Sequence, residues 1–70
     1  MKALKRLAHD YLNALTSISG FLDLALGEPD RSKRYAHMHR AQKELRRAIV
    51  IAKDLRARLE IKAKQYDEGD

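Results

Sequence analysis

The sequence predicts an all-α protein, an antiparallel helical hairpin that homodimerises into a four-helix bundle. Apolar residues recur at helical spacing in two long segments, and one short break that holds the only proline separates them. The chain has 70 residues, no cysteine and 6% aromatic residues. Because so short a chain builds little core and has no disulfide, one hairpin cannot cover both of its apolar faces. We therefore expect self-association to cover them.

The first helix is expected over residues 2–27. Apolar side chains recur three and four residues apart and form one stripe, which comprises Leu4, Tyr11, Leu15, Ile18, Leu22 and Ala25. Gly27 is expected to end this helix in the left-handed conformation, which glycine adopts at little cost. The stripe should therefore pack against the next helix.

The turn is expected at residues 28–30 and the second helix over residues 31–66. Pro29 suits a helix start, and Asp30 or Ser32 can cap the free amides. Three acid-base pairs four residues apart support the helix: Asp30 with Arg34, Asp54 with Arg58, and Glu60 with Lys64. Its buried stripe is expected to comprise Met38, Ala41, Leu45, Ala48, Ala52, Leu55, Leu59, Ala63 and Tyr66.

The hairpin geometry also predicts which residues lie level with one another. Since both helices rise equally per residue, the numbers of facing residues should sum to about 57–59. His9 would then lie level with residues 48–50, and Val50 or Ile51 would form an exposed apolar patch close to it. The second helix would extend beyond the first, which suggests a longer protein with a further helix upstream of Met1.

His9 lies outside the apolar stripe. Asn13, Thr16 and Gly20 follow it on the same outer ridge of the first helix, and Asp10 is its neighbour in sequence. We call His9, Asn13, Thr16 and Gly20 the outer ridge. An exposed imidazole among short polar neighbours favours a chemical role over packing.

The sequence HDYLNAL at residues 9–15, continuing into TSISGFL at residues 16–22, resembles the H-box of two-component sensor histidine kinases. Such boxes usually have a proline five positions after the histidine, where this chain has Ala14. The sequence is therefore most similar to the sporulation phosphotransferase B type of dimerisation and histidine-phosphotransfer domain. The match covers about 20 residues, and the second helix fits as a general amphipathic partner.

The resemblance implies a role for each polar residue. His9 would be the phosphoryl acceptor, since neutral imidazole, abundant at neutral pH, is nucleophilic. Asp10 would orient the ring and stabilise the imidazolium, and Asn13 would position water when a receiver aspartyl-phosphate is hydrolysed. Partner docking would involve Thr16, Gly20, Val50 and Ile51.

The resemblance also implies the partners. The whole chain, residues 1–70, would be one domain of a longer kinase, which the overhang of the second helix favours, or a stand-alone phosphotransferase. In either case it would be a homodimer that meets a response-regulator receiver domain and an ATP-binding kinase domain. The chain has no glycine-rich nucleotide motif, so ATP and Mg would be bound by that other domain and no cofactor by this chain. With no signal peptide and no long apolar run, we expect a cytoplasmic segment without membrane contact.

Two other functions explain part of the pattern. The net charge is +5, and a Rop-like dimeric hairpin that binds RNA would use such a charge. Interleaved acids and the lack of an aromatic stacking platform argue against this, so no nucleic acid is expected. A purely structural dimerisation module leaves the outer ridge unexplained. His37 and His39 are two residues apart, which is not a metal-binding spacing on a helix, and we assign them no function.

Overall fold

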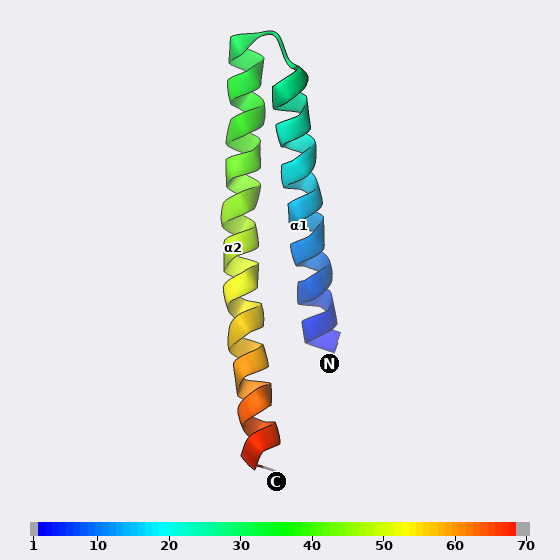
Figure 1. Cartoon of the computed structure of the whole chain (residues 1–70), viewed down its shortest axis with the longest axis vertical. Helices are drawn as coiled ribbons and strands as arrows, with labels where there is room; N and C mark the ends of the chain where they lie inside the picture. The colour runs from blue at the N-terminus through cyan, green and yellow to red at the C-terminus, as the bar shows by residue number, and fades with distance from the viewer. Residues whose placement is uncertain (1, 69–70) are drawn as a thin grey trace.

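The computed structural model describes the backbone of residues 2–68 and the side chains of residues 3–64. Within residues 2–68 the chain forms two α-helices and no strand: α1 spans Lys2–Gly27 and α2 spans Arg31–Glu68 (Figure 1). The helical hairpin predicted from the two apolar segments is therefore present. α2 ends two residues later than expected, and the predicted burial of Tyr66 lies outside the described side chains.

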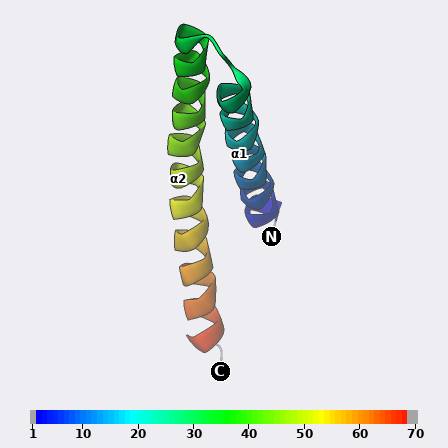
Figure 2. The same cartoon turned by 45° about the horizontal axis from the view of Figure 1, so that its top comes forward.

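The two helices lie side by side and antiparallel, and α2 continues well past the start of α1 (Figures 1 and 2). The molecule measures 59 × 15 × 13 Å, with a Cα radius of gyration of 16.8 Å. A compact domain of this length has a radius of gyration of about 11 Å. So elongated a shape leaves most side chains at the surface.

Alanines form the buried centre of the hairpin. Four side chains are buried, Ala14 and Ala25 on α1 and Ala41 and Ala48 on α2, and we call them the alanine seam. Half-buried residues continue the seam at spacings of three and four along both helices, among them Tyr11, Ile18, Ile51 and Leu55. This is the spacing by which two helices pack along a narrow line.

Most of the large side chains in the predicted stripes are partly exposed and lie beside the alanine seam. Five of them are 40–54% exposed: Leu15, Leu22, Met38, Leu45 and Leu59. The hairpin by itself therefore leaves these members of the two predicted stripes partly exposed, because each helix can turn only a narrow stripe toward one neighbour. Within the described residues no large side chain is fully buried.

The register of the hairpin also differs from the expected one. Tyr11 lines the same hollow as Ala52 and Leu55, whereas the expected register placed it level with residues of about 46–48. Figure 1 shows the reason, since α2 begins above the point where α1 ends. His9, which precedes Tyr11 by two residues, is therefore not level with residues 48–50.

The turn between the helices depends on proline and a carboxylate. Gly27 ends α1 without a positive φ, so the left-handed conformation expected of it was wrong. The amide of Glu28 instead donates to the carbonyl of Ala25 at 3.3 Å. Pro29 follows, and because it has no N–H and excludes helical geometry at the residue before it, the helix needs no glycine to stop.

Asp30 caps α2. Its Oδ1 accepts hydrogen bonds from the amides of Ser32 at 2.8 Å and Lys33 at 3.2 Å, and the amide of Asp30 donates to Oε1 of Glu28 at 3.1 Å. Of the two candidate caps, the structure uses Asp30. Pro29 lies before this cap and not in the helix.

One of the three expected ion pairs forms as predicted, between Asp54 Oδ1 and Arg58 Nε at 3.0 Å. Glu60 pairs at 3.0 Å with Arg56, one turn before it, and not with the expected Lys64, one turn after it. The carboxylate of Asp30 is engaged as the cap, so the Arg34 guanidinium donates instead to the carbonyl of Pro29 at 3.5 Å. These exposed pairs add little to stability.

We predict that Asp30→Ala lowers the free energy of unfolding by about 1 kcal/mol, because two amides of the first turn lose their acceptor. Urea unfolding followed by circular dichroism at one fixed chain concentration measures the change. Ser32→Ala is the matched control, since the structure uses only the amide of Ser32. Equal losses in both variants would contradict the assignment of the cap.

Candidate functional site

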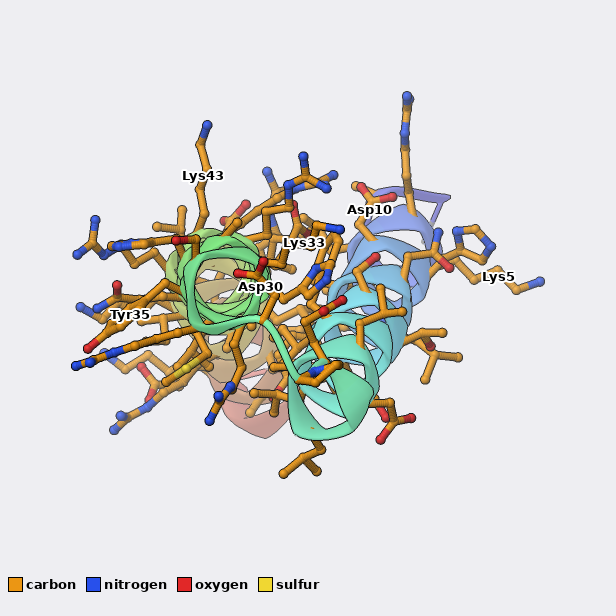
Figure 3. All side chains as sticks on the ribbon, turned by 90° about the horizontal axis from the view of Figure 1, so that it is seen from above. Lys5, Asp10, Asp30, Lys33, Tyr35 and Lys43 are labelled. Carbon is orange, nitrogen blue, oxygen red and sulfur yellow. The ribbon has the colours of Figure 1, made fainter. Side chains whose placement is uncertain are left out.

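His9 lies on the side of α1 that faces away from α2. Ala14, which is buried in the seam, follows His9 by five residues, a rotation of about 140° around the helix. In Figure 3, Lys5, one turn before His9, points away from α2. The imidazole is accordingly exposed, and it contributes nothing to the packing of the hairpin.

Asn13 contacts the imidazole of His9. The side-chain amide nitrogen Nδ2 of Asn13 lies 3.3 Å from Nδ1 of His9. The two residues are one helical turn apart, the separation at which side chains on a helix surface meet. The contact covers the ring nitrogen nearest the backbone and leaves the Nε2 edge as the outer edge of the ring.

Asp10 takes a different direction. Its side chain is half-buried, and in Figure 3 it points to the same broad side of the hairpin as Lys43 on α2, whereas Lys5 points outward. Among the described contacts, the His9 ring bonds to Asn13 and not to Asp10. The structure therefore brings Asn13 to the position at the ring that the resemblance implies for Asp10.

Thr16 and Gly20 continue the outer ridge toward the turn. Both are exposed, and Oγ1 of Thr16 donates to the carbonyl of Leu12 at 2.9 Å, so the hydroxyl hydrogen is engaged with the backbone of its own helix. A Cβ added at Gly20 would meet nothing within 4 Å. Beyond the His9 ring, the side chains of the outer ridge are therefore short, and they would not hinder the approach of a partner.

The two predicted docking residues on α2 differ from each other. Val50 is 67% exposed, and it follows the buried Ala48 by two residues, so it lies on the side of α2 away from α1. Ile51 is half-buried and continues the seam. Neither is joined to the outer ridge, since Val50 and His9 lie on opposite outer sides of the hairpin.

The start of α2 is a basic surface that the sequence interpretation did not single out. Residues 31–43 contain five Lys or Arg and no carboxylate. Arg31 and Arg34 line a shallow hollow with the exposed side chains of Tyr35 and Met38. The absence of acids between Asp30 and Glu44 was the available signal for this surface.

Some arrangements are not found among the described residues. No three His, Asp or Glu side chains there gather into a metal-binding group. In the same part of the chain, neither helix combines the length and the apolar character that crossing a membrane requires.

No protein-family model, curated protein or solved structure matches this chain.

We predict that His9→Ala changes the free energy of unfolding by no more than about 0.5 kcal/mol, because the ring is exposed and outside the seam. In contrast, Ala14→Leu should cost about 1–3 kcal/mol, since the seam has no room for the added carbons. Ala57→Leu, at an exposed position on α2, controls for the larger side chain. A loss with His9→Ala as large as that with Ala14→Leu would contradict the exposed placement.

Proposed function

We propose that this chain carries out histidine phosphotransfer in two-component signalling, with His9 as the phosphoryl acceptor. The observation that best supports this function is the exposed imidazole, which has no packing role and whose Nδ1 contacts an amide on the same helix. An imidazole held at one nitrogen and open at the other has the geometry of a nucleophile. The resemblance of residues 9–22 to the H-box favours the same chemistry.

In the proposed reaction, Nε2 of His9 forms a bond to the γ-phosphorus of ATP while the bond from that phosphorus to the bridging oxygen breaks and ADP leaves with the electron pair. ATP and Mg²⁺ would be held by a separate ATP-binding domain. In the second step a receiver aspartate attacks the phosphorus, the P–N bond breaks, and the imidazole recovers its lone pair. This chain supplies the alignment on which phosphoryl transfer depends.

The neighbouring residues have supporting roles in this proposal. Asp10 is the next residue in the sequence and makes no bond to the ring among the described contacts, so its carboxylate would act through its charge, which would stabilise the positive phosphorylated imidazole. Asn13 would position water in a phosphatase reaction on the receiver aspartyl-phosphate. The low surface around Thr16 and Gly20 would let the receiver domain approach His9 closely.

We further propose that two hairpins associate into a four-helix bundle. Leu22 on α1 lines one hollow together with Met38 and Leu45 on α2, so the partly exposed large side chains of both helices form one continuous apolar face. Covering such a face stabilises an assembly of hairpins. Leu15, which belongs to this face, lies about 120° around α1 from His9, so the bundle would leave the imidazole accessible.

RNA binding is the second candidate, and the acid-free start of α2 favours it. However, Arg31 and Arg34 share one side of the helix, whereas Lys33 lies about 100° or more around the helix from both, so the three do not form one continuous track for phosphates. Nucleic-acid interfaces also use clustered cations with stacking aromatics. Phosphotransfer explains both the outer ridge and, as attraction for an acidic receiver domain, the positive charge.

We predict that the chain acquires an acid-labile, base-stable label when it is incubated with a histidine-kinase ATP-binding domain and γ-labelled ATP, or with phosphorylated receiver domains. His9→Ala should abolish the label because it removes the nucleophile. His39→Ala should retain it, since His39 is the matched exposed histidine on α2. A folded wild-type chain that stays unlabelled with both kinds of donor but shifts RNA in a salt-dependent manner would overturn the proposal.

A further inference from the structure

We infer that Asn13 is a positioning residue for His9: its amide covers Nδ1, directs the phosphoryl group to Nε2, and keeps a hydrogen bond to the ring in both neutral forms of the imidazole. The inference rests on the proposed role of His9, because it concerns which ring nitrogen accepts the phosphoryl group. It gives Asn13 a role in acceptance itself, in addition to any role in dephosphorylation.

The first step of the argument is steric. Nδ2 of Asn13 lies 3.3 Å from Nδ1 of His9, a hydrogen-bonding separation with no space between the two atoms for a tetrahedral phosphoryl group. Nε2 is at the far edge of the ring, beyond the reach of the same amide. A phosphoryl donor that approaches the exposed ring therefore meets Nε2 first.

The second step concerns the ring protons. As the amide is placed, Nδ2–H donates to Nδ1, which needs the lone pair on Nδ1 and puts the proton of the neutral ring on Nε2. Attack by Nε2 needs the opposite form, with the lone pair on Nε2 and the proton on Nδ1. That proton needs an acceptor when the ring becomes positively charged.

An amide can serve both forms. If the Asn13 amide turns by about 180°, its Oδ1 replaces Nδ2 and accepts the Nδ1–H bond, because a side-chain amide carries a donor and an acceptor of similar size. A carboxylate at the same place could serve only the form that is protonated at Nδ1. Asn13 can therefore hold the ring before, during and after transfer, while the bond between Nε2 and phosphorus forms and the donor's leaving group departs.

The chain provides an internal reference for this effect. His39 is also exposed on a helix, but the fourth residue after it is Lys43, which has no neutral amide to offer. The Gln42 amide lines the same hollow as His39, yet among the described contacts it makes no hydrogen bond to the ring. His37 does not serve as a reference, since its Nδ1 is buried without a partner. His39 therefore reports how an imidazole of this chain reacts without an amide at Nδ1.

The test is chemical phosphorylation of the folded full chain with phosphoramidate, which transfers its phosphoryl group to histidine and releases ammonia. Nuclear magnetic resonance of ¹⁵N-labelled protein, at early times, gives the ratio of the Nδ1 and Nε2 isomers at each histidine. We expect His9 of the wild type to carry the group almost entirely on Nε2. In Asn13→Ala the share of the Nδ1 isomer at His9 should rise several-fold, with the ratio at His39 unchanged.

Asn13→Asp is the conservative variant. It keeps the size and an acceptor, so the preference for Nε2 should persist, while ¹⁵N shifts of the unphosphorylated neutral ring should move toward the form protonated at Nδ1. Asn13→Ala favours the helix intrinsically, so loss of folding does not confound the comparison. An isomer ratio at His9 that matches His39 in the wild type, or that Asn13→Ala leaves unchanged, would overturn the inference.

This experiment separates the inference from the proposed function. Phosphoramidate needs neither an ATP-binding domain nor a receiver domain. Selective reaction at Nε2 that depends on Asn13, together with no transfer from either protein donor, would support the positioning role and contradict the proposed function. Transfer from protein donors, with no effect of Asn13→Ala on the isomer ratio, would support the proposed function and contradict the positioning role.

Discussion

The alanine seam is the constraint on which the rest of the structure depends. Its four small side chains let α1 and α2 approach closely, but they bury little apolar surface. At about 0.8 kcal/mol per buried carbon, the four methyl groups contribute about 3 kcal/mol. Larger side chains bury more carbon atoms, so the seam is a minor source of stabilisation. The partly exposed leucines and Met38 are the side chains with more area to bury.

The seam also determines which way His9 faces. With Ala14 and Ala25 turned toward α2, the rotation of α1 about its axis is fixed, and the outer ridge must lie opposite the seam. Residues 7–27 contain no Lys or Arg, whereas residues 31–43 of α2 contain five and no acid. Under the proposed function, the positive charge of α2 would attract an anionic partner, and the imidazole on α1 would be the group that it meets.

Much of the fold could be predicted from local chemistry. Apolar periodicity predicted the two helices, Pro29 marked the turn, and the carboxylate of Asp30 caps α2 as one of two expected candidates. The stripes did not reveal which apolar residues the hairpin itself buries, because Leu15 and Ala14 belong to one broad apolar face. Ala14 is the residue buried between the helices because it is small enough to let α2 pack closely. The sequence of α1 alone does not show how α2 packs. The register was missed for a related reason, since it depends on how the turn offsets α2.

The candidate site was predictable in part as well. The spacing of residues 9–20 placed His9 on an exposed ridge, and the structure has the imidazole exposed. The partner of the ring was assigned to Asp10 by resemblance, whereas Asn13, four residues on, makes the contact. Side chains four residues apart meet on a helix surface, so the contact between His9 and Asn13 could have been predicted from their spacing. Phosphotransfer and dimerisation stay predictions.

The most direct test of the packing argument is sedimentation equilibrium of the wild-type chain over a range of micromolar concentrations, with Leu45→Glu as the comparison. If the alanine seam is too small and a second copy covers the exposed leucines and Met38, the wild type should have twice the mass of one chain. Leu45→Glu should then dissociate and lose helix content together, because a carboxylate in the shared face has no partner. A wild-type monomer that keeps full helix content throughout would show that the hairpin needs no second copy, and the account would be wrong.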